Sequence, residues 1–340
     1  MLDIFNDDAF SVTSLTDAVR DMKVRSSRIN DMGLFTEGGV SALTVAIERM
    51  GDTIQIVAPT PRGAPGDTKE VSKRNMTAIA VPHFQRDWSV MADEVQGVRE
   101  FGSENNLQTV MGVVAAKLAD NVADLDLTDE YSRLGAIQGV VTYKGGSTLD
   151  LYNTFGITAP SAITFDMSVD DGSLRQQCSG IIRGARKAVG ALSFDHIHAF
   201  VGDDFFDALL KSPEVRSTFT GWTDAQILRD SYTGATRAEN PIFEFGGIVW
   251  ENYGAIDDDG DGALVGIGAK KARFFPFGMP GLFRTYHAPA DYMETVNTIG
   301  LRRYAKQWPM VNGKGINGET QTNVLHICTR PNVLLSGAIS

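Results

Sequence analysis

The sequence contains very little cysteine: Cys178 and Cys328 are the two cysteines among 340 residues. Two cysteines cannot form the dense disulfide framework that stabilises small secreted domains. Both lie among apolar neighbours, one in a helix-like and one in a strand-like segment, so we expect buried free thiols in a chain from a reducing cytoplasm. A chain of this length with 43% hydrophobic residues can instead bury a substantial core.

The sequence also lacks a long uninterrupted apolar run. The longest predominantly apolar stretch, Val110–Ala119, is too short to span a bilayer and contains Lys117. Residues 1–8 include three acidic and no basic side chains, so we expect no signal peptide. These features predict a chain that has no membrane partner.

Basic residues are in the minority. The chain has 31 lysines and arginines against 42 aspartates and glutamates, and its formal net charge is −11. A general nucleic-acid-binding surface needs basic side chains that displace counterions from phosphates, so this balance argues against that function. It fits a surface that lies near a polyanion without binding it tightly.

Motifs that would build a catalytic or cofactor site are missing. No Gly-x-Ser-x-Gly turn occurs. Gly266-Ile-Gly268 and Gly313-Lys-Gly315 lack the other glycines and the Lys-Ser/Thr ending of phosphate loops. His196 and His198 share a strand face, but no third ligand stands at a metal-site spacing, so we interpret them as packing or surface histidines. We therefore predict no catalytic residue, no cofactor and no metal.

One acidic segment resembles the start of a calcium-binding loop. Asp257, Asp259 and Asp261 are followed by Gly262, but Gly268 stands where the loop needs a bidentate glutamate. We interpret this segment as a solvated turn.

The most informative stretch is Ser103–Leu134, whose apolar spacing predicts one long helix. Ser103 can cap its start and Gly135 can end it, although Asp126–Thr128 could interrupt it. Some thirty residues at about 1.5 Å each make a rod of roughly 45 Å, longer than most globular helices. A long core helix of an enzyme is the alternative. The predicted apolar face comprises Leu107, Val110, Met111, Val114, Leu118, Val122 and Leu125.

Two segments are expected to need a surface outside themselves. The sequence of residues 1–40 contains too few apolar residues to fold alone, which predicts an arm that lies on another surface rather than on its own core. Residues 41–88 predict a long hairpin, in which Thr44–Glu48 and Asp52–Val57 are followed by a returning strand at Met76–Val81. Three prolines and two glycines exclude helix or sheet interior from the segment between them.

The hairpin tip, Pro59–Asn75, carries four basic and two acidic residues, so its charge is +4 − 2 = +2 in an acidic chain. An isolated two-stranded ribbon is marginal in water, so we expect it to contact a neighbouring subunit. The alternative is a hairpin that folds onto its own domain. The residues expected at the intersubunit contact are Ile54, Ile56, Arg62, Lys69, Glu70, Lys73, Arg74 and Ile79.

The remaining segments mix strands and helices without regular alternation, which favours an α+β fold over a doubly wound sheet. Gly246-Gly247 is expected to form a bulge. The predicted helices are Ser173–Val189 and two shorter ones that begin at Asp203 and at Ser212-Pro213. The predicted strands and loops are a hairpin at Val140–Leu151, strands at His196–Val201, Ile242–Trp250, Ala263–Ile267, Val324–Cys328 and Val333–Leu335, and a loop at Val311–Thr322.

Several stretches together resemble one family. They are Asp3–Val12, Pro61–Pro65, Ala92–Glu104, Tyr304–Trp308, Asn312–Gly315 and Cys328–Pro331. They are similar to the lambda-type major capsid (major head) protein family of tailed bacteriophages, essentially from end to end. The resemblance implies an α+β, Hong Kong 97-like major capsid protein fold. Its implied parts are an N-terminal arm (1–40), an extended hairpin loop (41–88), a peripheral domain (89–165 and 296–340) with a spine helix (103–134), and an axial domain (166–295).

The resemblance also implies a function. The chain would be a non-enzymatic major capsid protein that self-assembles as hexamers and pentamers into the icosahedral head and encloses double-stranded DNA without sequence specificity. Implied partners are a scaffolding protein, a portal and a decoration protein. The implied location is the virion, with the host cytoplasm during assembly. The alternatives are the shell protein of a capsid-derived bacterial nanocompartment and an uncharacterised α+β enzyme.

Overall fold

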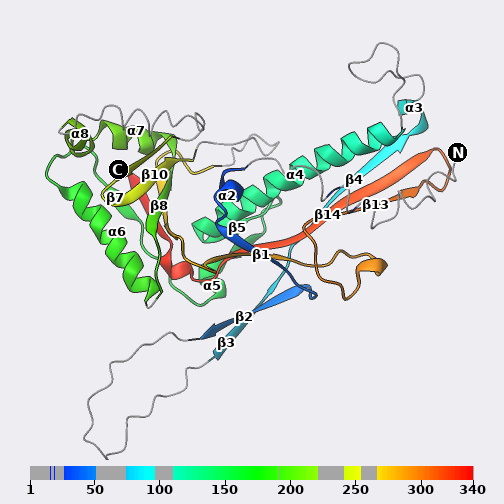
Figure 1. The fold of residues 1–340 in the computed structure, drawn as a ribbon, viewed down its shortest axis with the longest axis horizontal. Coiled ribbons are helices and arrows are strands. Elements are labelled where there is room, and N and C mark those ends of the chain that lie inside the picture. The colour runs from blue at the N-terminus through cyan, green and yellow to red at the C-terminus, as the bar shows by residue number, and fades with distance from the viewer. Residues whose placement is uncertain are drawn as a thin grey trace, which may run out of the picture. The chain divides into compact units, whose positions relative to one another are not determined.

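A computed structural model of the chain describes residues 16, 19, 27–50, 74–95, 110–190, 192–220, 241–253 and 266–339 (Figure 1). The chain divides into two compact units, each made of segments that are far apart in the sequence. Unit one comprises Met1–Val45, Ile79–Arg133 and Phe283–Ile327, and unit two comprises Ala46–Ala78, Leu134–Leu282 and Cys328–Ser340. Both units contain helices and strands, so the predicted α+β class is confirmed.

Unit one is built around a mixed five-stranded sheet. Its order is β1 (Phe35–Gly39), β12 (Phe283–His287), β14 (Gly315–Cys328) and β13 (Tyr304–Pro309), and β4 (His83–Met91) also pairs with β14. β1 is parallel to β12, whereas β4 and β13 are both antiparallel to β14. The first part of β14 therefore lies between β4 and β13.

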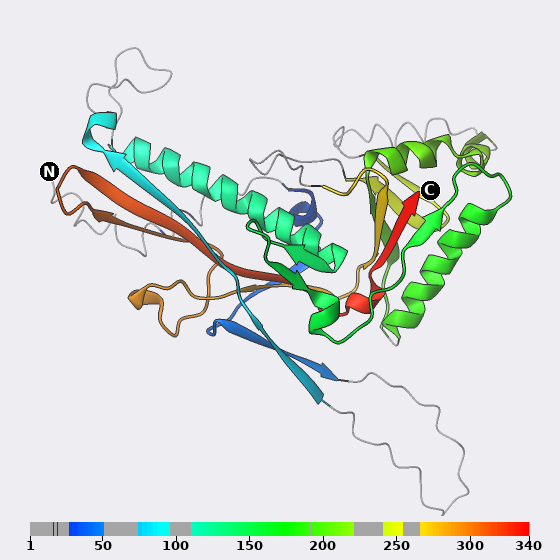
Figure 2. The same cartoon turned by 180° about the vertical axis from the view of Figure 1, so that it is seen from behind.

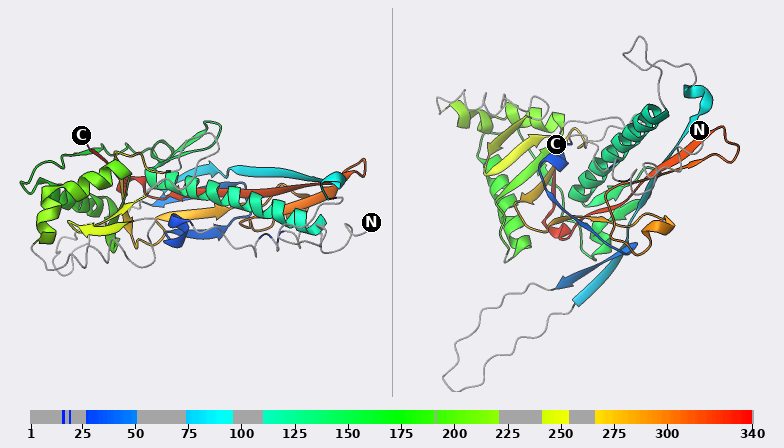
Figure 3. Two further views of the ribbon diagram at one scale, coloured as in Figure 1. Left: turned by 90° about the horizontal axis from the view of Figure 1, so that it is seen from above. Right: turned by 45° about the vertical axis from the view of Figure 1, so that its right-hand side comes forward.

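Helix α4 (Val110–Gln138) runs alongside β4 and β14, as Figures 2 and 3 show. Its aliphatic side chains pack against Trp88, Val90 and Ala305, which lie on one face of the sheet. The apolar spacing predicted this buried stripe, and Val114, Leu118, Val122 and Leu125 are indeed buried. Met111 was expected in the stripe but is 52% exposed.

The predicted end of this helix at Gly135 is wrong. The helix continues to Gln138, and Gly139, whose φ is +85°, follows its last turn. Within unit two, a Cβ atom on Gly135 would lie 2.8 Å from the Cα of Val141. Gly135 therefore allows the close approach of strand β5 (Val140–Thr142) and does not stop the helix. Asp126–Thr128 do not interrupt it either.

Unit two contains a six-stranded sheet. Its order is β7 (Ile163–Phe165), β15 (Leu335–Ile339), β11 (Lys271–Phe277), β8 (His196–Val201), β10 (Ile248–Asn252) and β9 (Ile242–Phe245). Helices α6 (Ser173–Val189), α7 (Asp203–Lys211) and α8 (Pro213–Thr220) contribute buried side chains to the same core as the sheet. The predicted bounds of α6 and β8 are confirmed, and Gly190 caps α6 as expected.

The shorter elements complete the chain. Strands β5 and β6 (Thr148–Asp150) form the predicted hairpin. Strands β2 (Thr44–Met50) and β3 (Arg74–Ala80) pair as a two-stranded sheet, and the predicted strand Asp52–Val57 lies outside the described residues. The remaining short helices are α2 (Arg28–Asp31), α3 (Ala92–Val95), α5 (Leu151–Thr154), η3 (Met293–Thr295) and η4 (Pro331–Val333).

Two predictions made from glycine-containing segments are wrong, as is the predicted start of the last strand. Gly246 and Gly247, with φ of +64° and +76°, form the two-residue turn of the β9–β10 hairpin and not a bulge. The predicted loop at Val311–Thr322 is, from Gly315 on, the start of β14. A side chain at Gly318 would collide with the Trp88 indole, so this glycine is needed for packing within a strand. Val333 belongs to η4, and the final strand begins at Leu335.

Part of the predicted arm packs on its own chain. Ile29 is fully buried and β1 is a strand of the unit-one sheet, so the expectation that residues 1–40 avoid their own core is wrong for this part. Thr16 and Val19 are also buried. The expected strand at Ala263–Ile267 lies mostly outside the described residues, and Gly266 and Ile267 are not in a strand.

Cys178 and Cys328 are buried free thiols, as predicted. Burial raises the pKa of each thiol to about 12, which keeps them protonated and unreactive. Among the described helices, none is long and apolar enough to cross a bilayer.

Candidate functional site

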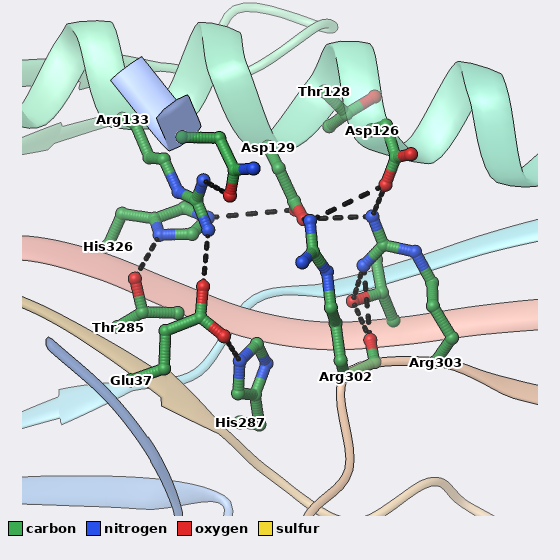
Figure 4. Close-up of polar contacts among 12 residues, drawn as sticks. Glu37, Asp126, Thr128, Asp129, Arg133, Thr285, His287, Arg302, Arg303 and His326 are labelled. Carbon is green, nitrogen blue, oxygen red and sulfur yellow. Dashed lines mark hydrogen bonds and ion pairs between the residues drawn. The ribbon is translucent and has the colours of Figure 1, made fainter. Parts of the chain in front are cut away.

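A network of charged side chains is buried beneath the middle of α4 in unit one (Figure 4). Asp126, Asp129, Glu130 and Arg133 are each at most 5% exposed, and Arg303, just before β13, is equally buried. Burying unpaired charges is very costly, so such a network persists only when its members satisfy one another.

Arg303 joins two carboxylates of the helix. Its Nη2 lies 2.7 Å from Oδ1 of Asp126 and 2.8 Å from Oδ2 of Asp129, and its Nη1 donates a hydrogen bond to Oγ1 of Thr322. Burial alone would lower the pKa of Arg303, but Asp129 and Asp126 outweigh it and raise that pKa. Arg302 lies farther away, with its Nη2 at 3.6 and 3.8 Å from the same two carboxylates.

His326, on β14, is the neutral member of the network. Burial lowers its pKa to about 4, although the neighbouring Asp129 opposes this shift. Its Nδ1 lies 2.8 Å from Oγ1 of Thr285, and its Nε2 lies 3.6 Å from Oδ1 of Asp129. A neutral ring fits these neighbours when Nδ1 accepts the Thr285 hydroxyl proton and Nε2 carries the proton that faces Asp129.

Burial would raise the pKa of Asp129, but Arg303 and His326 hold it well below its usual range. Asp129 therefore stays ionised at the centre of the network.

A second branch ties α4 to residues near β1. Nη1 of Arg133 donates to Oδ1 of Asn30 at 2.8 Å, and its Nη2 lies 2.7 Å from Oε1 of Glu37. Oε1 of Glu130 accepts a hydrogen bond from the backbone amide of Ile29 at 2.8 Å. These bonds hold α2 and β1 against the helix.

Glu37 connects this branch to β12. Its Oε2 lies 3.4 Å from Nε2 of His287. This hydrogen bond, together with Arg133 and Arg302, lowers the pKa of Glu37 to about 2 in spite of its partial burial. Figure 4 shows the helix, β1, β12, β14 and the Arg302-Arg303 pair converging on these side chains.

The network fastens distant segments of the chain together. Asp126, Asp129 and Glu37 are held in ion pairs with the guanidinium groups of Arg303 and Arg133. Removing one partner of a buried pair typically costs about 3–5 kcal/mol. The network therefore keeps β1, β12, β14 and α4 of unit one in a single arrangement.

The network was missed by sequence reasoning, although a signal existed. Asp126, Asp129, Glu130 and Arg133 continue the spacing of the apolar stripe along the helix, which places them on the buried face. Their partners lie far away in the sequence: Arg303 is 177 residues from Asp126. Only the tertiary structure brings them together.

Most of the residues predicted at an intersubunit contact lie outside the described residues; these are Ile54, Ile56, Arg62, Lys69, Glu70 and Lys73. The acidic segment that resembles a calcium-binding loop, with Asp257, Asp259 and Asp261, also lies outside them. Arg74 begins β3. Ile79 on the same strand is 4% exposed within this one copy of the chain. The intersubunit contact stays a prediction.

The two histidines of β8 pack inside unit two. Nε2 of His198 lies 2.9 Å from Oε2 of Glu251, and both side chains are buried. The His196 ring stacks on Phe277 with 4.9 Å between ring centroids. Within the part of the chain that the structure describes, no three His, Cys, Asp or Glu side chains are placed to hold a metal ion.

The chain fold is similar to that of two solved structures described as capsid proteins. The fold resembles that of a protein assigned to a prophage capsid in E. coli CFT073, with a TM-score of 0.58, 12% identity, and coverage of 97% of this chain and 99% of that one. It also resembles a chain of the capsid of cyanophage P-SCSP1u, with a TM-score of 0.50, 9% identity, and coverage of 94% and 91%. These similarities place the chain in the class of Hong Kong 97-like capsid folds, as predicted.

The family follows from the sequence. The model of the family described as phage major capsid protein E matches residues 11–339, so the chain belongs to that family. It is 24% identical to the major capsid protein of Salmonella phage Felix O1 over 96% of this chain and 95% of that one. It is 25% identical to the major capsid protein of Pseudomonas phage KPP10 over 90% of each chain. The resemblance found in the sequence is confirmed, and the chain is a self-associating structural protein of the virion capsid.

Proposed function

We propose that the chain assembles as hexamers and pentamers into the icosahedral head of a tailed phage and encloses its double-stranded DNA. The observation that carries this proposal is the family match over residues 11–339, together with a Hong Kong 97-like fold. The formal charge of −11 supports a shell lining along which DNA slides without sequence-specific binding. Assembly takes place in the host cytoplasm and requires no catalytic step by this chain.

The parts of the subunit have separate roles in this proposal. Residues 1–40 are the N-terminal arm and 41–88 the extended loop. Residues 89–165 and 296–340 form the peripheral domain, with a spine helix at 103–134, and 166–295 form the axial domain. The 29-residue helix α4 supports the assignment of a spine, and the six-stranded sheet supports a separate axial body.

The extended loop reaches a neighbouring subunit. Among the described strands, β2 and β3 pair with each other and with no strand of the larger sheets. Leu43, just before β2, is 65% exposed, and Met76, within β3, is 69% exposed. The residues proposed to make the contact are Ile54, Ile56, Arg62, Lys69, Glu70, Lys73 and Arg74. Ile79 is already covered within its own copy and is left out of the proposed contact.

Three further proteins complete the head: a scaffolding protein, a portal and a decoration protein. Their roles rest on the lambda-type family resemblance.

Electron microscopy of the expressed chain, with and without its scaffolding protein, tests the proposal. We expect closed shells with fivefold and sixfold capsomers, and double-stranded DNA inside particles purified from infected cells. Closed particles that carry protein cargo in place of DNA would instead indicate a nanocompartment. A monomer in light scattering with measurable turnover would indicate an enzyme.

A further inference from the structure

Helix α6 differs in charge from the acidic chain to which it belongs. Its 17 residues include four basic side chains and no acidic one, whereas the whole chain has a formal charge of −11. One side of the helix is buried against unit two, through Leu174, Cys178, Ile181, Ala185 and Val189. Figure 2 shows the helix along the outside of the unit-two strands. Its positive charge is therefore concentrated on the side that faces away from its own core.

The exposed side of α6 forms one continuous surface. At about 100° per residue, the four basic side chains fall within an arc of about 120°, and Arg175 and Lys187 are separated along the axis by about 18 Å. Uncharged polar residues and glycines occupy the neighbouring positions. We call this surface the basic face of α6, and its exposed members are Arg175, Gln176, Ser179, Gly180, Arg183, Gly184, Arg186 and Lys187.

The basic side chains of this face form no ion pair with a carboxylate in the part of the chain that the structure describes. Nη2 of Arg175 donates a hydrogen bond to Oγ1 of Thr218 at 2.6 Å, and its Cζ lies 5.6 Å from the centre of the Phe245 ring. Nε of Arg183 donates to the carbonyl of Ser179 at 3.3 Å, one turn earlier in the same helix. Both partners are neutral groups, so these contacts orient the guanidinium groups without neutralising them.

The helix does not need these charges for its own stability. Arg175 lies in the first turn, where the helix dipole disfavours a positive charge, and Arg183 lies at neither end. The buried carboxylate of Glu214 serves the first turn instead, because it accepts a hydrogen bond from the backbone amide of Arg175 at 3.3 Å. Arg186 and Lys187, in the last turn, do suit the dipole. Folding of the subunit therefore leaves at least two of the four basic residues unexplained.

Two glycines of the basic face are also unexplained by packing within the chain. A Cβ on Gly180 would meet no described atom within 4 Å, and one on Gly184 would meet a single atom of Leu335, at 3.9 Å. Neither has the left-handed backbone that favours glycine, and glycine destabilises the interior of a helix relative to alanine. Because they carry no side chain, these two positions let a partner approach the helix backbone closely.

The chemistry of the basic face favours a nucleic-acid backbone over a protein partner. None of its members carries a large apolar side chain, whereas the centre of a protein–protein interface is apolar. Interfaces with DNA are more polar and more positively charged, and Arg, Lys, Ser and Gln side chains donate to phosphate oxygens there. A duplex carries roughly ten phosphates along about 18 Å, so each basic group of the face can find a counterpart.

We propose that the basic face of α6 binds the phosphate backbone of duplex DNA inside the shell. This inference rests on the proposed function, because it names the surface at which each subunit meets the enclosed DNA. Four positive charges give a weak contact that does not read the base sequence, and the negative charge of the rest of the chain opposes a tighter one. Many such contacts hold the duplex beside the shell and still let it slide.

Removal of two charges tests this contact. The variant Arg183→Gln with Lys187→Gln keeps good helix formers on the exposed side of α6. The matched control is Lys211→Gln with Lys271→Gln, which removes two charges from exposed positions on α7 and β11 of the same unit. Fluorescence anisotropy of a labelled duplex of mixed sequence measures binding to the unassembled full chain over a salt series, and circular dichroism checks folding.

We expect the α6 variant to bind the duplex at least about tenfold more weakly than wild type at low salt. The slope of log affinity against log salt should become shallower by about 2, because each lost phosphate contact removes about 0.9. The control should stay within about twofold of wild type, since it removes the same net charge away from the contact.

Equal losses in the two double variants would overturn the inference, because they would reflect net charge alone. Wild-type affinity in the α6 variant would overturn it too, as would the absence of wild-type binding at low salt. Binding of polyglutamate through α6, without binding of the duplex, would assign the face to an acidic protein instead.

Lysine acetylation in whole particles, read by mass spectrometry, separates this inference from the proposed function. Lys187 should be protected in DNA-filled particles and become reactive once the DNA has been released, with Lys211 as the reference for general accessibility. Equal reactivity of Lys187 in filled and emptied particles would overturn this inference alone. Particles that never contain duplex DNA would count against the proposed function.

Discussion

Arg303 lies at the centre of the buried network, since one of its nitrogens lies within 2.8 Å of carboxylates on both Asp126 and Asp129. Arg302, its neighbour in the chain, faces the same two carboxylates from a greater distance and is a quarter exposed. We therefore expect the two adjacent arginines to make very different contributions to the stability of unit one.

We expect Arg303→Ala to destabilise unit one by about 3–5 kcal/mol, because it leaves two buried carboxylates without their main partner. Arg302→Ala is the matched control and should cost about 1 kcal/mol or less, since longer and more exposed pairs contribute little. Urea denaturation of the unassembled subunit measures both. Equal losses for the two variants would contradict the assignment of Arg303 as the central cation.

Two groups of the network make unit one less stable in acid, in different pH ranges. Because burial lowers the pKa of His326 from 6.5 to about 4, the unfolded chain binds a proton that the folded unit does not. Stability is then complete above about pH 6.5 and falls toward pH 4. The His287 hydrogen bond and Arg133 lower the pKa of Glu37 from 4.5 to about 2, so a further loss occurs as the pH falls from 4.5 to 2.

We therefore expect His326→Asn to flatten the dependence of stability on pH between 6.5 and 4, and Glu37→Gln to flatten it between 4.5 and 2. Urea midpoints measured across this pH series give both slopes, and each variant serves as the control for the other range. Slopes identical to wild type in both variants would show that neither group titrates as described.

At the scale of single elements, α4 shows that the burial of an apolar stripe depends on which neighbouring elements cover it. Val114 is 3% exposed and Met111 is 52% exposed, although both belong to the apolar stripe that the spacing defines. The sheet covers Val114 from one side, whereas Met111, near the start of the described helix, stays half exposed.

Val114→Asp should abolish soluble folding, because it buries an unpaired charge. Met111→Asp should leave the yield and the melting temperature of the unassembled subunit nearly unchanged. The soluble fraction and thermal melts followed by circular dichroism compare the two. Normal folding of Val114→Asp would mean that this face of the helix is not buried.

Gly246→Ala should destabilise unit two by about 1–3 kcal/mol. The residue has a φ of +64°, and a Cβ there would lie 2.7 Å from Cβ of Cys178 and 2.9 Å from its sulfur. Gly180→Ala on α6 is the control: a Cβ at this position would have no neighbour within 4 Å among the described residues, so the change should stabilise the helix by about 0.5–1 kcal/mol. Similar melting temperatures for the two variants would contradict the tight turn.

At the scale of the whole molecule, the exposed apolar side chains point to assembly. Single exposed apolar residues are ordinary, but Met293, Val296 and Ile299 occur within seven residues of the chain. A subunit that self-associates repeatedly can cover such surfaces with copies of itself.

Deletion of Arg62–Lys73, with a short glycine linker closing the gap, should leave the subunit folded and block shell formation. The deleted segment contains no apolar cluster that its own subunit needs, whereas a clamp on a neighbour would be lost. Circular dichroism tests folding, and sedimentation tests assembly. Full-sized shells formed at the normal rate by this variant would show that the hairpin is not an intersubunit clamp.

Some features of this protein could be determined from the sequence by itself. Helix α6 and strand β8 have their predicted bounds, because their apolar residues recur at the spacing of a helix and a strand. The long helix was predicted from the same kind of local spacing. The family could also be identified, since its matching segments extend over nearly the whole chain.

The tertiary structure decided everything that depends on distant partners. The stretch from Gly315 to Thr322 resembles a loop locally, yet it is a strand because β4 and β13 pair with it on both sides. Gly135 and Gly318 resemble breaks, yet each makes room for a neighbour in its own unit. Arg303 meets Asp126 across 177 residues, and no local pattern encodes that distance. Local spacing specifies which face of an element is buried, whereas only the folded chain specifies what lies against it.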